Sequence, residues 1–497
     1  MKIFLGIDSG TQSTKVMFYN PDSKKIVAQS SSPHKLISDS TGKSEQEASW
    51  WIEALKSAMH RIPADIRKSV VAVGVSGQQH GFVPVDKSGK VLSPVKLWND
   101  TTTVSECHQI TEVYGGEKTL LRNVGNLILP GYTASKILYF KKHHPELYRQ
   151  MSTILLPHDY LNYYLTGNYT MECGDASGTG LLNIRTRQWD ENLVRIVDSD
   201  RDLLSCLPGL IHSVESSGFI RKEAAKELGL EAGIVVSSGG GDNMMGAIGT
   251  GTNIKGSLTV SLGTSGTLYG FSDTPIIDPE GNLAAFCSST GGWLPLLCTM
   301  NCTVATEQIR ALFKLNLNQI ENSVEGSKPG AGGIITLPFF CGERIPNLPH
   351  GKACLMGIDM TNLTPGNLFR SAMESALFGL KLGLESFTSL GFEAKEIKLI
   401  GGGAKSEVWR QMAANIFNLP IVSPMVDEAA AFGAALQALW CFLNLGRDEV
   451  DLNTILSEHV VFDQDKRQTP EVVEVEHYSE VYDHYRNYLD TVSPLFR

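Results

Sequence analysis

Two short segments of this sequence share one pattern, in which an apolar strand runs into a turn of glycine and hydroxyl residues and returns as a second strand. The first covers residues 3–19, with its turn at residues 9–13, and the second covers residues 257–271, with its turn at residues 263–266. Such a pattern predicts a β-hairpin in each place. A hairpin at the head of two halves of similar length predicts two related α/β domains that face each other across a central cleft.

The length supports this division, because 497 residues exceed what one hydrophobic core usually holds. We place an N-terminal domain at residues 1–247, a C-terminal domain at 248–446 and a helical appendage of the second domain at 447–497. The boundary lies near residues 246–256, GAIGTGTNIKG, whose glycines suit a hinge. The same glycines are also compatible with tight packing.

Strand and helix patterns alternate elsewhere in the chain, which predicts a mixed α/β fold. Residues 70–75 and 397–400 have the apolar runs of strands, and residues 50–60 have the period of an amphipathic helix. After Gly446 the sequence becomes acidic and helical in pattern.

The first turn, in IDSGTQSTK (residues 7–15), joins a carboxylate at a strand end to backbone N–H groups that can surround phosphate oxygens. A carboxylate beside a polyphosphate makes sense when it faces Mg²⁺, directly or through water, and we assign Asp8 to this ion. The loop residues predicted to bind ATP are Gly10, Thr11, Ser13, Thr14 and Lys15. The segment lacks the GK[ST] ending and the helix of a P-loop, and an ordinary hairpin turn is the alternative.

Two further glycine segments offer the rest of a nucleotide site. In VSLGTSGT we assign Gly263 and Thr264 to the phosphates, with Thr264 donating near the γ-phosphate. In LIGGGAKSEVW a strand runs into a helix, whose N-terminus favours a nucleotide, and Gly402, Gly403 and Ser406 are candidates for the adenosine. A glycine triplet alone is also typical of a dinucleotide-binding crossover.

The segment SSGGGDNMMGAIG (residues 237–249) places Asp242 after three glycines at a strand end. An aspartate in such a turn suits a general base that accepts the proton of an acceptor hydroxyl during phosphoryl transfer. Helix capping is the alternative, since aspartate is a favoured N-cap residue. Asn243 offers a neutral amide for a second hydroxyl, and the pair favours the catalytic interpretation.

Two polar clusters follow predicted strands and describe a carbohydrate pocket. SGQQHG contributes Gln79 and His80, while LWND contributes Trp98 as a flat apolar wall together with Asn99 and Asp100. A lone histidine such as His80 is more often structural than functional, so this assignment depends on the other members of the cluster.

Composition limits the classes of partner. The formal net charge is −10 and no Lys/Arg cluster tracks a phosphate backbone, which argues against nucleic acid. Nine scattered cysteines without a CxxC pair indicate a reducing compartment, the cytoplasm, rather than a disulfide framework or a zinc site. The longest apolar stretch, residues 429–443, is shorter than the ~20 residues of a membrane span, so no membrane association is predicted.

Taken together, these segments resemble the FGGY carbohydrate kinases of the actin/hexokinase/Hsp70-like superfamily over most of the chain. Besides the motifs above, the resemblance rests on GNLILPGYTASKILY, LLPHDYLNYYLTG, GDASGTGLLNI and CGERIPN. It implies two ribonuclease H-like domains closing on ATP and sugar, with Asp242 as the catalytic aspartate and Asp8 beside Mg²⁺. Homodimers are common in the family, so a homodimer is compatible with the resemblance.

The resemblance also bears on the acceptor. The Gln79-His80 pair matches the ketose-binding residues of the family, and LWND is typical of members that act on xylulose, which predicts phosphorylation of D-xylulose at its 5-hydroxyl. The sequence departs from the family at Ile345, where threonine is common, and in DEAAAFGAALQA, where glycine often precedes the alanines. Ribulose, gluconate, glycerol or a deoxyketose remains an alternative acceptor. A degenerate ATP- and sugar-binding sensor is the non-enzyme alternative.

Overall fold

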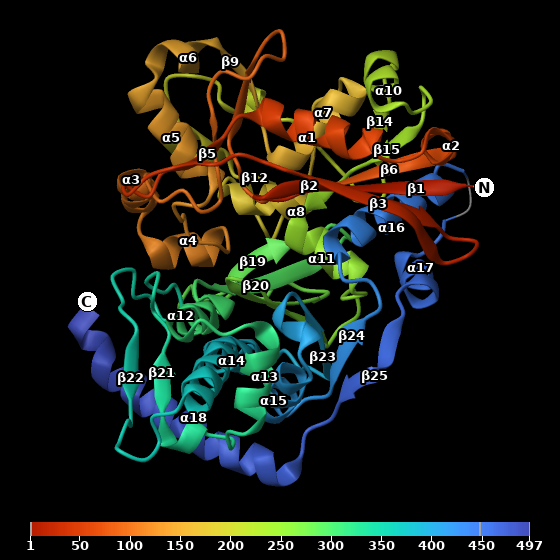
Figure 1. The fold of residues 1–497 in the computed structure, drawn as a ribbon. Coiled ribbons are helices and arrows are strands. Elements are labelled where there is room, and N and C mark those ends of the chain that lie inside the picture. The colour runs from red at the N-terminus through yellow and green to blue at the C-terminus, as the bar shows by residue number, and fades with distance from the viewer. Residues whose placement is uncertain (1, 447–448, 497) are drawn as a thin grey trace. The chain divides into compact units, whose positions relative to one another are not determined.

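The computed structural model describes residues 2–446 and 449–496, which form two compact units (Figure 1). The first unit contains Met1–Asn253, Ser272–Pro295 and Glu428–Val460, and the second contains Ile254–Phe271, Leu296–Asp427 and Val461–Arg497. The predicted mixed α/β fold in two parts is confirmed.

The first unit is built on a sheet with the strand order β14-β15-β6-β1-β2-β3, in which β16 also pairs with β6. Its strands are β1 (Ile3–Ser9), β2 (Ser13–Asn20), β3 (Lys25–Pro33), β6 (Val70–Gly77), β14 (Ser216–Phe219), β15 (Val235–Ser237) and β16 (Gly240–Gly241). The predicted first hairpin is confirmed, because β1 and β2 pair antiparallel. The predicted strand at residues 70–75 is β6, which lies parallel to β1.

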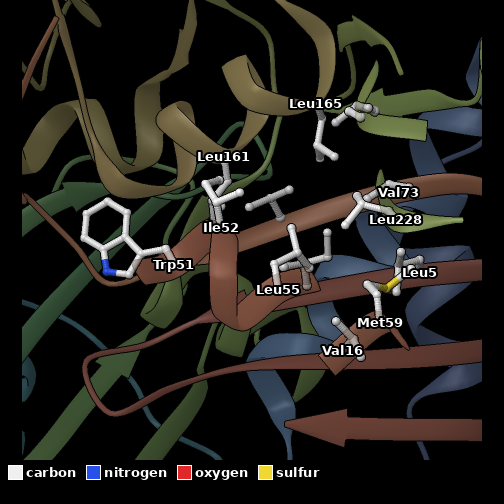
Figure 2. Packing of buried hydrophobic residues seen from close by; sticks show 14 of the residues in the cluster. Leu5, Val16, Trp51, Ile52, Leu55, Met59, Val73, Leu161, Leu165 and Leu228 are labelled. Carbon is white, nitrogen blue, oxygen red and sulfur yellow. The ribbon is translucent and has the colours of Figure 1, made fainter. Parts of the chain in front are cut away.

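One face of this sheet packs against helices. These are α1 (Ala48–His60), α7 (Pro157–Thr166) and α10 (Lys222–Leu228). Leu5 of β1 and Val73 of β6 belong to the same buried cluster as Trp51 and Leu55 of α1 and Leu161 of α7 (Figure 2). Because side chains alternate along a strand, the residues between these apolar positions point to the opposite face.

The opposite face of β1 and β6 lies against α16 (Ala429–Asn444). A Cβ atom at Gly6 would lie 1.9 Å from the carbonyl oxygen of Ala431, and one at Gly74 would lie 2.0 Å from that of Ala434. These glycines therefore let the helix backbone rest directly on the sheet. Two residues beyond Gly6 along β1, Asp8 has the same facing, which directs it toward the N-terminal end of α16.

Close helix packing also explains part of the predicted hinge. Gly246 and Gly249 belong to α11 (Asp242–Gly249), and a Cβ atom at Gly249 would lie 1.9 Å from the carbonyl oxygen of Ala429 in α16. The units divide between Asn253 and Ile254, within the predicted boundary region of residues 246–256. The first half of that region is therefore a packed helix.

Several smaller elements complete the first unit. The helices are α3 (Val104–Tyr114), α5 (Thr133–His143), α8 (Cys173–Ala176), α9 (Glu191–Val197) and α17 (Leu452–His459). The short strands pair as β4 (Ile37–Ser38) with β5 (Ser44–Gln46), β5 with β8 (Val95–Lys96), β7 (Val83–Asp86) with β9 (Met151–Leu155), and β10 (Thr170–Glu172) with β13 (Gly209–Ile211).

The second unit has its own sheet, in the order β20-β18-β17-β23-β24-β25. Its strands are β17 (Ser257–Leu262), β18 (Gly266–Gly270), β20 (Trp293–Thr299), β23 (Glu396–Ile400), β24 (Ile421–Pro424) and β25 (Phe462–Gln468). The antiparallel pairing of β17 and β18 confirms the second predicted hairpin. The helices are α12 (Thr303–Phe313), α13 (Leu317–Glu325), α14 (Pro365–Ser389), α15 (Glu407–Phe417) and α18 (Val472–Val492), and β21 (Ile335–Leu337) pairs with β22 (Cys354–Met356).

The two units differ from the predicted domains toward the C-terminus. Helix α16 was placed in the second domain, but its glycine- and alanine-rich surface packs on β1 and β6 of the first unit. The tail is not helical throughout, because β25 pairs antiparallel with β24, and α17 belongs to the first unit. The predicted boundary at residue 447 lies outside the described residues.

Candidate active site

Asp8 lies near the end of β1, where its two neighbouring strands supply its partners. In the sheet register it stands opposite Lys15 of β2 and Ser76 of β6, and the Ser76 hydroxyl donates to Asp8 Oδ1 at 2.8 Å. Burial raises the pKa of Asp8, while the Ser76 hydrogen bond and the charge of Lys15 partly oppose the rise. Asp8 is thus a buried carboxylate whose negative charge is incompletely balanced by the protein.

The turn after Asp8 is connected to the predicted sugar wall. The Trp98 indole N–H donates to Thr11 Oγ1 at 3.0 Å, and the Thr11 hydroxyl donates to Gln78 Oε1 at 3.0 Å. Gly10 N–H donates to the carbonyl of Ser13 at 3.1 Å, which closes the turn. The structure therefore brings Trp98 together with the predicted phosphate loop.

Two residues of this loop have side chains that are already engaged within the protein. Thr14 is buried, and its hydroxyl lies 3.1 Å from Ser9 Oγ and 2.8 Å from His34 Nε2. Lys15 forms an ion pair with Glu428, the residue before α16. Of the five predicted ATP-binding residues in this loop, Thr14 and Lys15 therefore have a structural use that the sequence did not reveal.

Asp242 is the first residue of α11, directly after β16, which pairs with the end of β6. Gly241 is the N-cap, so the capping alternative does not describe Asp242. Burial raises the pKa of Asp242 to about 7, and the negative charges of Asp8 and Asp175 add to the rise. Asp8 is thus close enough to Asp242 in the first unit for its charge to raise the pKa of Asp242.

Asn243 and Gln79 form the polar neighbourhood of this carboxylate. Asn243 Nδ2 donates to Gln79 Oε1 at 2.6 Å and lies 3.2 Å from Asp242 Oδ1, which also accepts from the Asn243 backbone N–H at 2.8 Å. Gln79 Nε2 lies 3.1 Å from Met244 Sδ. Residues selected from two separate segments of the sequence therefore form one hydrogen-bonded group.

His80 follows Gln79 and has a left-handed backbone, with φ of 60°. Its Nδ1 lies 3.0 Å from Asp175 Oδ1, and its ring centroid lies 5.2 Å from those of both Tyr132 and Phe286. The histidine is therefore held between the Asp175 carboxylate and two aromatic rings.

The two residues after Trp98 differ in their use. Asp100 is completely buried, and its carboxylate accepts from Ser44 N–H at 2.9 Å, from Lys96 at 3.3 Å and from both the backbone and the hydroxyl of Thr102. These bonds give Asp100 a use inside the protein, and its role as a sugar ligand stays a prediction. Among residues 2–446 and 449–496, the buried Asn99 Oδ1 has no hydrogen-bond partner, as expected for an amide that binds a polar ligand.

The sequence interpretation gave no role to Asp175, which the structure places beside His80, or to the two residues behind it, His158 and Asp159. Asp175 of α8 contacts both His80 and His158 of α7, whose other ring nitrogen lies 2.9 Å from Asp159 Oδ1. Their motifs, GDASGTG and PHDY, were visible as family segments. Only the contact with His80 distinguishes these residues from ordinary buried polar groups.

The predicted nucleotide loops of the second unit lie on adjacent strands, because β17 and β23 are parallel neighbours. Gly263 O accepts from the backbone and the hydroxyl of Thr303, at 3.0 Å and 2.9 Å, which anchors the turn, while Thr264 is exposed. A Cβ atom at Gly403 would lie 2.9 Å from Leu262 Cβ, so glycine allows the two loops to approach closely.

The second of these loops turns into α15. Gly402 is exposed, and a Cβ atom there would meet nothing within 4 Å. The Ser406 hydroxyl donates to Glu321 Oε1 at 3.0 Å and caps the helix by accepting from Trp409 N–H. Ser406 is therefore engaged as an N-cap, whereas Gly402 offers an open backbone surface at the start of a helix.

A divalent cation fits the chemistry of the first unit. The negative charge of Asp8 raises the pKa of the nearby Asp242 carboxyl. A cation bound between such carboxylates would reduce their repulsion. In the part of the chain that the structure describes, no group of three or more His, Cys, Asp or Glu side chains could hold a metal by itself. Mg²⁺ suits such a site, because it keeps several waters and binds through few carboxylates together with substrate phosphates.

Comparisons with known proteins give this geometry a family. The model of the N-terminal domain of the FGGY family of carbohydrate kinases matches residues 3–249, and that of the C-terminal domain matches residues 258–442. The chain belongs to the FGGY family of carbohydrate kinases. It is therefore a phosphotransferase with an alcohol group as acceptor, and its substrates are ATP and a sugar.

Relatives within the FGGY family cover the whole chain. The xylulose kinase of Haemophilus influenzae is 40% identical over 98% of this chain and 99% of its own. A structure from Brucella ovis named a "xyloylose kinase" matches with a TM-score of 0.91 and 27% identity over 99% of this chain and 100% of its own. A gluconate kinase from Lactobacillus acidophilus matches with a TM-score of 0.90 at 23% identity, over 100% and 99% of the two chains, and shows the fold alone.

The structure also bears on membrane association and on the position of Ile345. Within residues 2–446 and 449–496, no helix combines the length and hydropathy that a membrane span requires. Ile345 stands where threonine is common in the FGGY family. It is partly buried and is joined to Pro346 by a cis peptide bond.

Proposed function

We propose that this FGGY kinase transfers the γ-phosphoryl group of ATP to the 5-hydroxyl of D-xylulose. The observation that carries the proposal is the group formed by Asp242, Asn243 and Gln79, in which a carboxylate with a pKa of about 7 stands beside two amides. The carboxylate can accept a hydroxyl proton, and the amides can bind further hydroxyls of a polyol.

Asp242 acts in this proposal as the general base. A base works best when its pKa lies near the working pH, because it is then deprotonated and still takes a proton readily. The ordinary pKa of an aspartate is too low for this, and burial together with Asp8 and Asp175 supplies the shift. The proton of the attacking hydroxyl passes to a carboxylate oxygen of Asp242 as the oxygen bonds to phosphorus.

Asp8 holds Mg²⁺ in this proposal, directly or through water. The ion neutralises phosphate charge when it is bound. Ser76 keeps the Asp8 carboxylate oriented by its hydrogen bond to Oδ1, which leaves Oδ2 for the ion or its waters. The Gly10 N–H closes the turn, so the backbone at Thr11 is the part of the turn that serves the phosphate oxygens in this proposal.

The second unit contributes the nucleotide loops. Thr264 is exposed on a turn whose carbonyls are tied to α12, so its hydroxyl and N–H are presented on a fixed backbone. Gly402 leaves room for a nucleoside at the N-terminal end of α15, where the helix dipole also favours phosphate.

The acceptor is argued from the relatives and from the pocket residues. The Haemophilus influenzae relative acts by name on xylulose. Trp98 is fastened to the turn after Asp8, and the buried Asn99 Oδ1 has no protein partner, so both remain suited to a sugar. The fold does not decide the acceptor, since a gluconate kinase shares it. We also propose the cytoplasm as the location, which suits nine free thiols, and a homodimer as the assembly.

The test is the release of ADP from ATP·Mg²⁺ by the purified chain, with and without a panel of sugars. We expect kcat/KM for D-xylulose to exceed that for L-xylulose, D-ribulose, gluconate and glycerol by at least tenfold. A higher value for another sugar would reassign the acceptor and keep the kinase. Sugar-independent ADP release, or none with any sugar, would contradict the proposed reaction and favour a nucleotide-binding sensor.

A further inference from the structure

A chain of buried charged residues leads away from His80 into the first unit. Asp175 Oδ1 lies 3.0 Å from His80 Nδ1, and Asp175 Oδ2 lies 3.2 Å from His158 Nδ1. His158 Nε2 in turn lies 2.9 Å from Asp159 Oδ1. The side chains of His158, Asp159 and Asp175 are completely buried, so these contacts form a fixed arrangement away from water.

The charges along this chain are defined. Burial opposes ionisation of Asp175, but the hydrogen bonds from His158 and His80 outweigh it and lower the pKa of Asp175 to about 2. Burial likewise opposes the charged form of His158, but Asp159 and Asp175 raise its pKa well above the ordinary value. Asp175 is therefore an ionised acceptor that faces His80, with its second oxygen occupied by the His158 cation.

The backbone of His80 is held as firmly as its ring. Its carbonyl oxygen accepts from Lys136 Nζ at 2.8 Å and from the Thr133 hydroxyl at 3.1 Å, both on α5. These bonds fix the carbonyl in the left-handed conformation of φ 60° that a non-glycine residue rarely adopts. A residue held in a strained conformation by several separate groups is typical of a functional position.

Gly178 provides the space for the imidazole. A Cβ atom at Gly178 would lie 1.8 Å from His80 Cε1 and 2.0 Å from His80 Nδ1. Neither atom is backbone, but the ring is confined on its other sides by Tyr132, Phe286 and Asp175. The absence of a side chain at Gly178 thus reserves one orientation of the His80 ring.

We propose that Asp175 is a positioning residue for the acceptor sugar, acting through His80. With Nδ1 only 3.0 Å from the ionised carboxylate, the neutral ring favours the tautomer that carries its proton on Nδ1, and Nε2 then accepts a hydrogen bond from a sugar hydroxyl. His158 and Asp159 hold Asp175 in place from behind. This inference rests on the proposed function, in which His80 contacts the sugar.

The alternative is that the chain only stabilises the interior, and a pair of matched variants separates the two. Asp175→Asn removes the ionised partner of His80 and of His158, whereas Asp159→Asn removes a partner of His158 alone. Both remove one buried carboxylate charge, and both are expected to lower the unfolding temperature. A difference between them in sugar affinity therefore reports on the site rather than on stability, and the His80→Ala background described below separates His80 from Asp242, whose pKa Asp175 also raises.

The experiment measures kcat, KM for D-xylulose and KM for ATP. We expect Asp175→Asn to raise KM for D-xylulose about tenfold, as for a lost hydrogen bond, with KM for ATP within about twofold of the wild type. Asp159→Asn should change KM for D-xylulose by less than about threefold. An unchanged KM in Asp175→Asn, or equal increases in the two variants, would overturn the proposal.

A double-mutant cycle tests the route of the effect. If Asp175 acts through His80, Asp175→Asn should add nothing to KM for D-xylulose in a His80→Ala background. Full additivity would mean that Asp175 acts elsewhere. The wild type serves as the reference throughout, so a wild type without sugar-dependent turnover would contradict the proposed function itself, not this inference alone.

Two further measurements keep the proposal testable if Asp175→Asn does not fold. Gly178→Ala pushes on the His80 ring without changing any charge and should also raise KM for D-xylulose more than KM for ATP. The second measurement uses NMR of the wild-type protein labelled with ¹⁵N-histidine. The signals that disappear in His80→Ala identify the His80 ring. A neutral ring with its proton on Nδ1 is expected, and a proton on Nε2, in either a neutral or a cationic ring, would overturn the proposal.

Discussion

The two hairpins that begin the two sheets have the same backbone plan and different chemistry. In the first, the residue one position before the last paired residue of β1 is Asp8, and in the second the corresponding residue of β17 is Ser261. Asp8 is buried beside Ser76, Lys15 and the charge of Glu428, whereas residues 261–267 contain no ionisable side chain.

The second residue after the first strand of each hairpin, Thr11 or Thr264, shows the same contrast. Thr11 receives the Trp98 N–H and donates to Gln78, so its hydroxyl is part of the protein's internal hydrogen bonding. Thr264 is exposed, and its turn is anchored through backbone carbonyls. The two hairpins therefore share a backbone plan, but the side chains around the first are charged or hydrogen-bonded within the protein, whereas the turn of the second carries an exposed hydroxyl.

Asp242→Asn should produce the largest loss of turnover, because it removes the proposed general base of the first unit and leaves both hairpins intact. We expect kcat to fall about 10²–10⁴-fold, the usual contribution of general-base catalysis. Binding of ATP, measured by calorimetry, should stay within about threefold of the wild type. Near-normal turnover would remove Asp242 from the proposed role.

Thermal unfolding of the same variant controls for misfolding. Asp242 has a folded pKa of about 7 against an ordinary value of 3.8, so its ionisation costs stability as the pH rises between these values. Asn cannot ionise, and the variant should therefore unfold a few degrees higher than the wild type at pH 8 and at nearly the same temperature at pH 4. A lower unfolding temperature at pH 8 would show that the lost activity reflects structural damage.

Asp8→Asn and Ser261→Ala compare the corresponding positions of the two hairpins. We expect Asp8→Asn to reduce kcat about 10²–10³-fold, the range for loss of one charge-stabilising group, and to raise the Mg²⁺ concentration needed for half-maximal rate. Ser261→Ala should change kcat by less than about threefold. Equal losses in the two variants would mean that the hairpins share the work, against the asymmetry described here.

The backbone plan of both hairpins could be predicted from the sequence, because strand periodicity and turn residues are local. The predicted strand at residues 257–262 is β17 to the residue, and the predicted helix at residues 50–60 lies within α1. The strand β25 was missed, because its sequence FDQDKRQ has no apolar alternation and its pairing with β24 is a tertiary contact.

The site was predictable where the chemistry follows from a residue's position at a strand end, and not where it depends on distant partners. Asp242, Asn243 and Gln79 were selected from motifs and do form one group. The internal hydrogen bonds of Asp100 could not be predicted, because its carboxylate accepts in part from Ser44, which is 56 residues away. Asp175 was passed over because only the fold reveals its contact with His80.

The pH dependence of turnover should report on the ionisation of Asp242. Asp242 must be deprotonated to accept a proton, and burial with Asp8 and Asp175 raises its pKa to about 7. We therefore expect kcat/KM for D-xylulose to fall about tenfold per pH unit below pH 7 and to level off above it. The residual activity of Asp242→Asn should lack this limb. If the variant retains it, the limb belongs to another group, such as the nucleotide.

Thr11→Ala and Thr264→Ala should show the smallest effects on activity. We expect the first to lower stability and sugar affinity, and the second to lower ATP affinity alone. Thr11 exchanges two hydrogen bonds with Trp98 and Gln78, so its removal should cost about 1–3 kcal/mol of stability and raise KM for D-xylulose through the loosened Trp98. Thr264 is exposed, and its removal should leave the unfolding temperature nearly unchanged while KM for ATP rises about 3–10-fold. Thermal unfolding and both KM values decide the matter. A Thr264→Ala protein with wild-type KM for ATP would leave the second hairpin without a side-chain contribution, and its backbone N–H groups would then be the sole phosphate contact that this turn can offer.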